Sequence, residues 1–134
     1  MPVDTLNILQ ASVTKTATFN GAALILPGGT PRRGMNARII YSAAGNASGA
    51  NAVTFSVDVC YDGVPTLWFA DFVAPPINLV VAIQQGELFI PFSVSPTMVS
   101  GVITAPQIRL TATFSGAGST PTITYQGDLS LTRP

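Results

Sequence analysis

Apolar and polar residues alternate with a period of two along several stretches of this chain, and the clearest alternation begins after Asn51. From residue 53 to residue 61 every odd position is apolar, whereas the even positions carry Thr, Ser, Asp and Cys. This is the pattern of a β-strand with one buried face. The segment Asp62–Pro65 interrupts the alternation as a turn does. A second apolar run ends at Phe72, so Asn51–Phe72 predicts a β-hairpin.

Folding this hairpin about its turn fixes which residues face each other. The expected cross-strand pairs are Tyr61 with Thr66, Val59 with Trp68, Val57 with Ala70, and Phe55 with Phe72. One face of the hairpin would then be almost wholly apolar and would hold the single tryptophan of the chain. Directly opposed aromatic and β-branched side chains stabilise a sheet by roughly 0.2–1 kcal/mol per pair. We therefore expect this face to form the centre of the core.

A second hairpin is predicted from Gln107–Phe114 and Thr122–Leu131, which flank the loop Ser115–Pro121. The expected pairs place large side chains against small ones: Phe114 with Ile123, Ala112 with Tyr125, Leu110 with Gly127, and Ile108 with Leu129. The opposite face, which is either wet or in contact with a partner, would carry Arg109, Thr111, Thr113, Thr124, Gln126 and Asp128. The complete predicted core is Phe55, Val57, Val59, Trp68, Phe72, Ile108, Leu110, Phe114, Ile123, Tyr125 and Leu129.

The remaining sequence contains only short apolar segments, because 12 Gly and 11 Pro interrupt every window long enough for a helix. Further strands are predicted within Thr5–Phe19, Ala22–Leu26, Met35–Tyr41, Ile77–Ile83 and Glu87–Val94. Loops or connections are predicted at Pro27–Gly34, Ser42–Ala50 and Ser95–Ala105. Proline cannot donate a hydrogen bond to the ladder, so Pro91 predicts that its strand lies at a sheet edge or contains a bulge.

These elements favour an all-β fold, a single-domain β-sandwich or jelly roll of about eight or nine strands, with a small β-barrel as the alternative. A length of 134 residues suits one domain with one core. Residues 1–10 are expected to form an N-terminal arm or the first strand, and residues 11–134 the sandwich domain.

Charged residues make up only 9% of the chain, and six basic residues balance six acidic ones. A surface of uncharged polar residues costs little to desolvate and suits burial against partners, although β-sandwiches are commonly Thr-rich in any case. Zero net charge argues against direct binding of nucleic acid. No stretch approaches the roughly 20 apolar residues of a membrane span, and the N-terminus lacks the pattern of a signal peptide, so we expect production in a cytoplasm.

Catalytic chemistry has few candidate residues, because the chain contains no His and one Cys. Without a histidine base, Cys60 is expected to be a small buried or semi-buried apolar group. Carboxylates at Asp58, Asp62 and Asp71 are the candidates for glycoside hydrolysis or calcium binding. Positions in a turn and on the polar face of strands account for them better. We therefore expect no catalytic residue, no metal site and no cofactor.

Two further patterns have a functional and a structural interpretation. Ser12–Lys15 matches the S-x-x-K pattern of hydrolases that use a lysine base, but it lies in a strand-like run rather than at a helix start, and we interpret it as coincidence. The pair Arg32 and Arg33, within the predicted loop Pro27–Gly34, is the only local concentration of charge. It would bind a carboxylate or phosphate, or it forms a solvated loop tip.

The chain also resembles a known group of proteins in four stretches, Asp4–Leu9, Leu26–Gly34, Phe55–Gly63 and Gly118–Tyr125. These stretches resemble small virion proteins of tailed phages, especially the decoration or cement proteins of the capsid. The similarity extends over most of the chain and lies in its composition and general sequence character, without a diagnostic motif. It implies a β-rich domain that forms symmetric oligomers and clamps neighbouring capsid subunits. It also implies an extended arm, here Met1–Gln10, that adds a strand to a neighbouring subunit.

The leading expectation is therefore a non-enzymatic virion structural protein, made in the host cytoplasm, that binds the major capsid protein or other virion proteins. A role in the tail, neck or baseplate is compatible with the same features. The alternatives are a carbohydrate- or ligand-binding module that uses Trp68 or Phe69, and a hydrolase that uses the aspartates. Low charge and an apolar arm predict a homo-oligomer, preferably a trimer. The candidate partner contacts are Leu6, Ile8, Leu9, Arg32 and Arg33.

Overall fold

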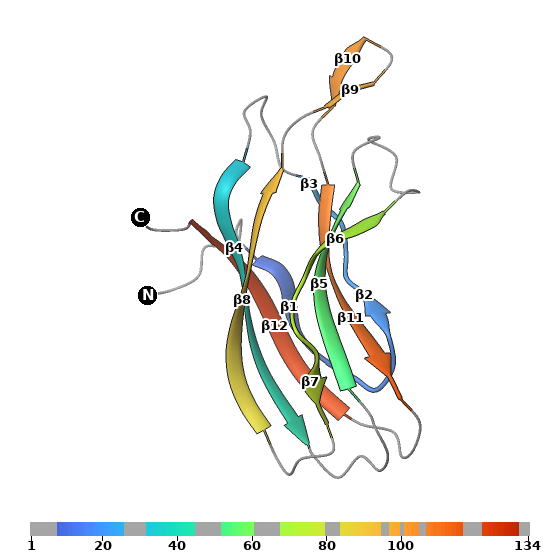
Figure 1. Ribbon diagram of the computed structural model, residues 1–134, viewed down its shortest axis with the longest axis vertical. Helices are drawn as coiled ribbons and strands as arrows, with labels where there is room; N and C mark the ends of the chain where they lie inside the picture. The colour runs from blue at the N-terminus through green and yellow to red at the C-terminus, as the bar shows by residue number, and fades with distance from the viewer. Residues whose placement is uncertain are drawn as a thin grey trace.

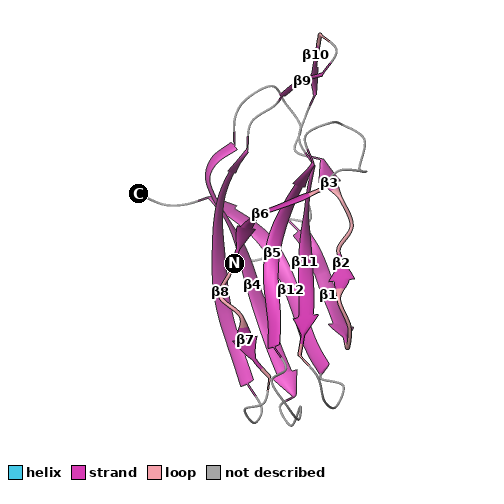
Figure 2. Cartoon of the chain, turned by 45° about the vertical axis from the view of Figure 1, so that its right-hand side comes forward, coloured by secondary structure: helices cyan, strands magenta, loops and turns pink. Residues whose placement is uncertain are grey.

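The computed structural model shows an all-β chain in which two antiparallel sheets face each other as a sandwich (Figure 1). It describes residues 8–25, 32–44, 52–60, 68–79, 84–94, 97–99, 101–104, 107–116 and 122–131. All regular structure in these ranges is strand, as Figure 2 shows, and none of it is helix. The predicted fold class is confirmed.

Each sheet is built from strands that are distant in the sequence. Sheet A has four strands in the spatial order β1 (Ile8–Lys15), β12 (Thr122–Leu131), β4 (Arg32–Ala44) and β8 (Gln84–Val94). Sheet B has the order β2 (Phe19–Asn20), β11 (Gln107–Ser115), β5 (Ala52–Cys60) and β6 (Phe69–Val73), with β3 (Leu24–Ile25) paired to β11 and β7 (Ile77–Asn78) paired to β5. A separate small hairpin joins β9 (Thr97–Val99) to β10 (Val102–Thr104).

The core lies between the sheets and consists of the inward-facing positions of both. Its centre is an aromatic pair, Phe55 of sheet B and Tyr125 of sheet A, whose ring centroids lie 4.9 Å apart in an edge-to-face arrangement. The predicted core residues that are buried are Phe55, Val57, Val59, Ile108, Leu110, Ile123, Tyr125 and Leu129. Phe72 and Phe114 are half-buried and pack against this cluster. Trp68 is also half-buried but lies outside the core, so its predicted place there is wrong.

The first predicted hairpin exists as β5 and β6, but with a different register. Val57 pairs with Phe72 rather than with Ala70, and Val59 pairs with Phe69. Relative to the prediction, the partner of Val59 is shifted by one position, and an extra residue in β6 between the two pairs forms a bulge that makes the shift two positions at Val57. A shift of two preserves the side-chain alternation, so Phe72 still packs against the core. The predicted turn, Asp62–Pro65, lies outside the described residues.

The second predicted hairpin is wrong, because β11 and β12 belong to different sheets. Nine consecutive pairs join β11 to β5, whereas β12 lies between β1 and β4. The expected match of Leu110 with Gly127 nevertheless exists across the sandwich: a Cβ on Gly127 would lie 2.8 Å from Leu110 Cδ2. Alternation identified the buried faces of both strands correctly, but it does not distinguish a ladder neighbour from a residue of the facing sheet.

Several boundaries also differ from the prediction. The predicted connection Ser95–Ala105 contains β9 and β10, which turn at Gly101 with a φ of 81°. Within the predicted strand Ile77–Ile83, only the first two residues are strand, and residues 80–83 lie outside the described ranges. Strand β4 begins at Arg32 and continues to Ala44, so it takes in the ends of both neighbouring predicted loops. The inference from Pro91 is confirmed, because β8 is an edge strand of sheet A.

Candidate functional site

The strongest candidate for chemistry, Asp58, lies on the outer face of sheet B and is 5% exposed. Its Oδ1 accepts a hydrogen bond from Ser56 Oγ at 2.9 Å. Its Oδ2 accepts one from Thr111 Oγ1 at 2.6 Å and one from Arg109 Nε at 3.2 Å. Three donors on two neighbouring strands therefore satisfy this carboxylate, as a buried charge requires.

This arrangement suits a structural carboxylate better than a catalytic one, because both oxygens of Asp58 are already occupied. Asp62 and the side chain of Asp71 lie outside what the structure describes. Cys60 is fully buried in β5, where no substrate reaches its thiol. Among the described residues, no group of three or more His, Cys, Asp or Glu side chains is placed to hold a metal ion. Those residues also include no helix long and apolar enough to cross a membrane.

Trp68 extends this network toward β6. The guanidinium of Arg109 lies over the indole, with Cζ 4.3 Å from the ring centroid. One face of the ring is therefore covered by the cation, which argues against Trp68 as an open stacking platform for a sugar. Phe69, the next residue, is 44% exposed. Of the two aromatic residues considered for a ligand-binding module, Phe69 is therefore the exposed one.

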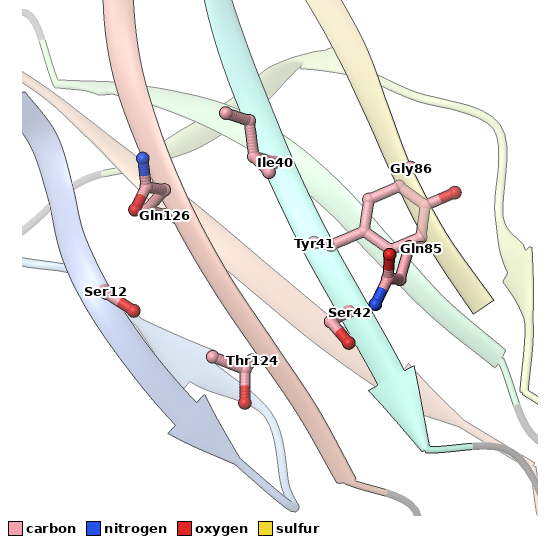
Figure 3. A pocket seen from close by; sticks show the side chains of 8 residues that line it. All are labelled: Ser12, Ile40, Tyr41, Ser42, Gln85, Gly86, Thr124 and Gln126. Carbon is pink, nitrogen blue, oxygen red and sulfur yellow. The ribbon is translucent and has the colours of Figure 1, made fainter. Parts of the chain in front are cut away.

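The outer face of sheet A carries uncharged polar side chains around one ion-pair cluster. Arg38 lies 2.7 Å from Glu87 and 3.8 Å from Asp128, measured from guanidinium nitrogen to carboxylate oxygen. A shallow hollow of about 240 Å³ lies on the same sheet (Figure 3). It is lined by Ser12, Ile40, Tyr41, Ser42, Gln85, Gly86, Thr124 and Gln126. Hydroxyl and amide groups from all four strands thus provide neutral donors and acceptors on this face.

One side of the sandwich is more apolar than this face. It is the side where the edge strands β6 and β8 meet, and the rings of Phe72 and Phe92 pack there with centroids 6.0 Å apart. Outside this contact, Val73 is 56% exposed and Phe89 is 50% exposed. A hollow of about 340 Å³ between the strands is lined by Phe72, Val73, Ala74, Pro75, Phe89, Ile90 and Pro91. We name this region, together with Phe69, the β6–β8 surface.

Of the five predicted partner contacts, the structure describes the side chains of Ile8 and Leu9. Leu6 lies outside the described residues, and nothing is described of the side chains of Arg32 and Arg33. Leu9 is wrong as a partner contact, because it is buried in the core of its own chain. It faces inward since Ile8–Lys15 is a strand paired to β12, so the predicted arm is at least in part the first strand. Ile8, on the outer face, is 38% exposed.

Val73 and Phe89 are the contact candidates that sequence reasoning missed. A signal for them was present in the prolines: Pro75 and Pro76 follow β6, and Pro91 lies inside β8. Proline inside a strand is confined to edges and bulges, so Pro91 marks β8 as an edge strand, whereas Pro75 and Pro76 mark only the end of β6.

No protein-family model matches the sequence, and comparison with curated proteins gives no significant match.

Proposed function

We propose that this chain is a non-enzymatic structural protein that binds other protein subunits through the β6–β8 surface. The observation that carries the proposal is the distribution of exposed apolar residues. Among the residues whose side-chain exposure is described, the three most exposed large apolar ones, Phe69, Val73 and Phe89, all lie on these two edge strands. Clustered exposed apolar residues are typical of interaction sites.

The backbone of β6 supports the same surface. Ala74 N–H donates to Phe55 O at 2.9 Å, so Ala74 and Phe55 form a hydrogen-bonded pair. Hydrogen-bonded and non-hydrogen-bonded pairs alternate in an antiparallel ladder, which makes the neighbouring pair of Val73 and Ser56 non-hydrogen-bonded. The N–H and C=O of Val73 therefore point away from β5 toward the free edge. A partner strand can use such groups for pairing.

In its specific form the proposal is a virion protein that decorates a phage capsid and bridges its subunits. This form is supported by the resemblance to phage decoration proteins, by the low charge of the chain and by the sandwich fold. A tail, neck or baseplate component would use the same kind of surface. We further propose that the protein is a homo-oligomer, with a trimer preferred, because 9% charged residues and no net charge give copies little mutual repulsion.

The test is a pair of surface substitutions compared with a matched control. Phe89→Ser and Val73→Ser remove apolar area from the β6–β8 surface, whereas Ile40→Ser removes it from the outer face of sheet A, where Ile40 is 36% exposed. We expect the first two variants to lose oligomer mass in sedimentation and attachment to phage particles, with the control unchanged. Attachment of the wild type should fall little with added salt, because few ion pairs are available to be screened.

Unchanged mass and attachment in both Phe89→Ser and Val73→Ser would refute the β6–β8 surface. An effect confined to Ile40→Ser would transfer the contact to the outer face of sheet A.

A further inference from the structure

The start of β6 is held to sheet B by a side-chain contact that reaches over a neighbouring strand. Trp68 directly precedes β6, and Arg109 belongs to β11, with β5 lying between these two strands. The contact is the stacking of the Arg109 guanidinium on the indole at 4.3 Å. The ladder here is irregular, because the bulge in β6 falls between the partners of Val57 and Val59. The stacking therefore acts where regular pairing is weakest.

The cation in this contact is itself fixed in place. Arg109 Nε donates to Asp58 Oδ2 at 3.2 Å, and Asp58 is held in turn by Ser56 and Thr111. The side chains of Arg109 and Asp58 are 19% and 7% exposed, so the ion pair is largely shielded from water. A cation–π contact is stronger when its charge is desolvated and preoriented.

We infer that Asp58 and Arg109 form a clamp that docks Trp68 on the outer face of sheet B and thereby positions Phe69. Arg109 is in this sense a positioning residue, because Phe69 is the next residue in the chain and belongs to the β6–β8 surface. The part of the inference that concerns Phe69 as a contact rests on the proposed function. The clamp itself is a property of the isolated chain and can be measured without a partner.

Trp68 is the single tryptophan of the chain, so indole fluorescence reports on the surroundings of this one ring. Arg109→Met keeps a long apolar side chain and removes the charge over the ring. In this variant we expect the Trp68 emission to shift to longer wavelength and acrylamide to quench it more strongly. The ratio of docked to undocked indole should fall about 2- to 30-fold, the range that the strength of a cation–π contact implies. Arg109→Lys should restore part of the docking.

The matched control is Lys15→Met. Lys15 Nζ lies 3.8 Å from the centroid of the Phe19 ring, so this variant removes a cation–π contact of the same kind elsewhere in the chain. Its Trp68 emission and quenching should equal those of the wild type. A change as large as that of Arg109→Met would show that the fluorescence follows general loosening, and it would overturn the clamp.

Arg109→Met leaves Asp58 buried without its cation, which can unfold the chain. The double variant Asp58→Asn/Arg109→Met removes both charges and keeps the measurement possible, with circular dichroism as the check of folding. Wild-type emission and quenching in the folded double variant would overturn the clamp. Sedimentation then tests the role of Phe69: an undocked ring with unchanged oligomer mass refutes the positioning role, whereas the result for Phe89→Ser decides the proposed function independently.

Discussion

The Tyr125 hydroxyl is the one buried side-chain polar atom in the described residues without a hydrogen-bond partner, and its removal gives a sharp test of the core. Tyr125 is 1% exposed and its ring packs edge-to-face on Phe55. Tyr125→Phe keeps the ring and that contact but deletes the hydroxyl. A buried polar group without a partner costs about 1–3 kcal/mol. We therefore expect the variant to be more stable than the wild type.

The size of the gain follows from two opposing terms. Removal of the unsatisfied hydroxyl should stabilise the folded state by about 1–3 kcal/mol. The small void left in its place should destabilise it, because each lost dispersion contact costs about 0.1–0.2 kcal/mol per atom pair. A net increase of about 1 kcal/mol in the free energy of unfolding is the expected result. With a urea m-value of about 1–3 kcal/mol/M, the unfolding midpoint should rise by about 0.3–1 M.

Equilibrium unfolding in urea at pH 7 measures this shift, and Tyr41→Phe is the matched control. Tyr41 is half-buried, and its hydroxyl is not among the buried groups that lack a partner, so we expect no comparable gain. A midpoint for Tyr125→Phe that falls by the equivalent of 1 kcal/mol or more would refute the reasoning. It would mean that the hydroxyl is hydrogen-bonded, for instance to a buried water.

The remaining predictions concern pH, packing and the N-terminus. Burial raises the pKa of Tyr125 from 10.0 to about 12. Between these pH values the unfolded state loses the proton first, so the free energy of unfolding falls as pH rises. Urea unfolding measured up to pH 12 should show the wild type losing about 2–3 kcal/mol more stability than Tyr125→Phe. Gly127→Ala should destabilise the chain by about 1–3 kcal/mol, because the added methyl group clashes with Leu110. The double variant Gly127→Ala/Leu110→Val should recover part of this loss. Additive losses in the double variant would contradict the packing of Gly127 against Leu110 between the two sheets. Deletion of residues 1–7, which leaves β1 intact, should reduce oligomer mass in sedimentation if subunits exchange this segment, and an unchanged mass would exclude the exchange.

The sequence was sufficient for the fold class and for the core-facing side of β5, β11 and β12. In β5, the alternation of apolar odd positions places Phe55, Val57 and Val59 on the core face directly, because successive side chains of a strand point to opposite faces of the sheet. Neighbours were less predictable. Leu110 and Gly127 were correctly matched in size, yet they meet between sheets, since alternation carries no information about which strands share a ladder.

The β6–β8 surface could be found only in part from the sequence. Pro91 marks β8 as an edge strand, but the exposure of Val73 and Phe89 depends on which strands end each sheet, and that is a property of the whole topology. A sequence window around either residue looks like an ordinary apolar strand. The place where the two edges meet is formed by segments that are distant in the chain.

Polar positions were the least predictable, because a window along one strand equates polarity with exposure. Arg109 and Thr111 were placed on a face that is wet or in contact with a partner, yet they pair directly across the ladder with Asp58 and Ser56, and the polar groups satisfy one another under cover. Five of the twelve charged residues, the six basic plus the six acidic, are ion-paired: Asp58 with Arg109 in the shielded network on sheet B, and Arg38 with Glu87 and Asp128 on the more exposed outer face of sheet A. The charge left for contacts with a partner is thus smaller than composition suggests. Under the proposed function, affinity would come mainly from apolar contacts and backbone pairing, which the edge strands β6 and β8 offer among the described residues.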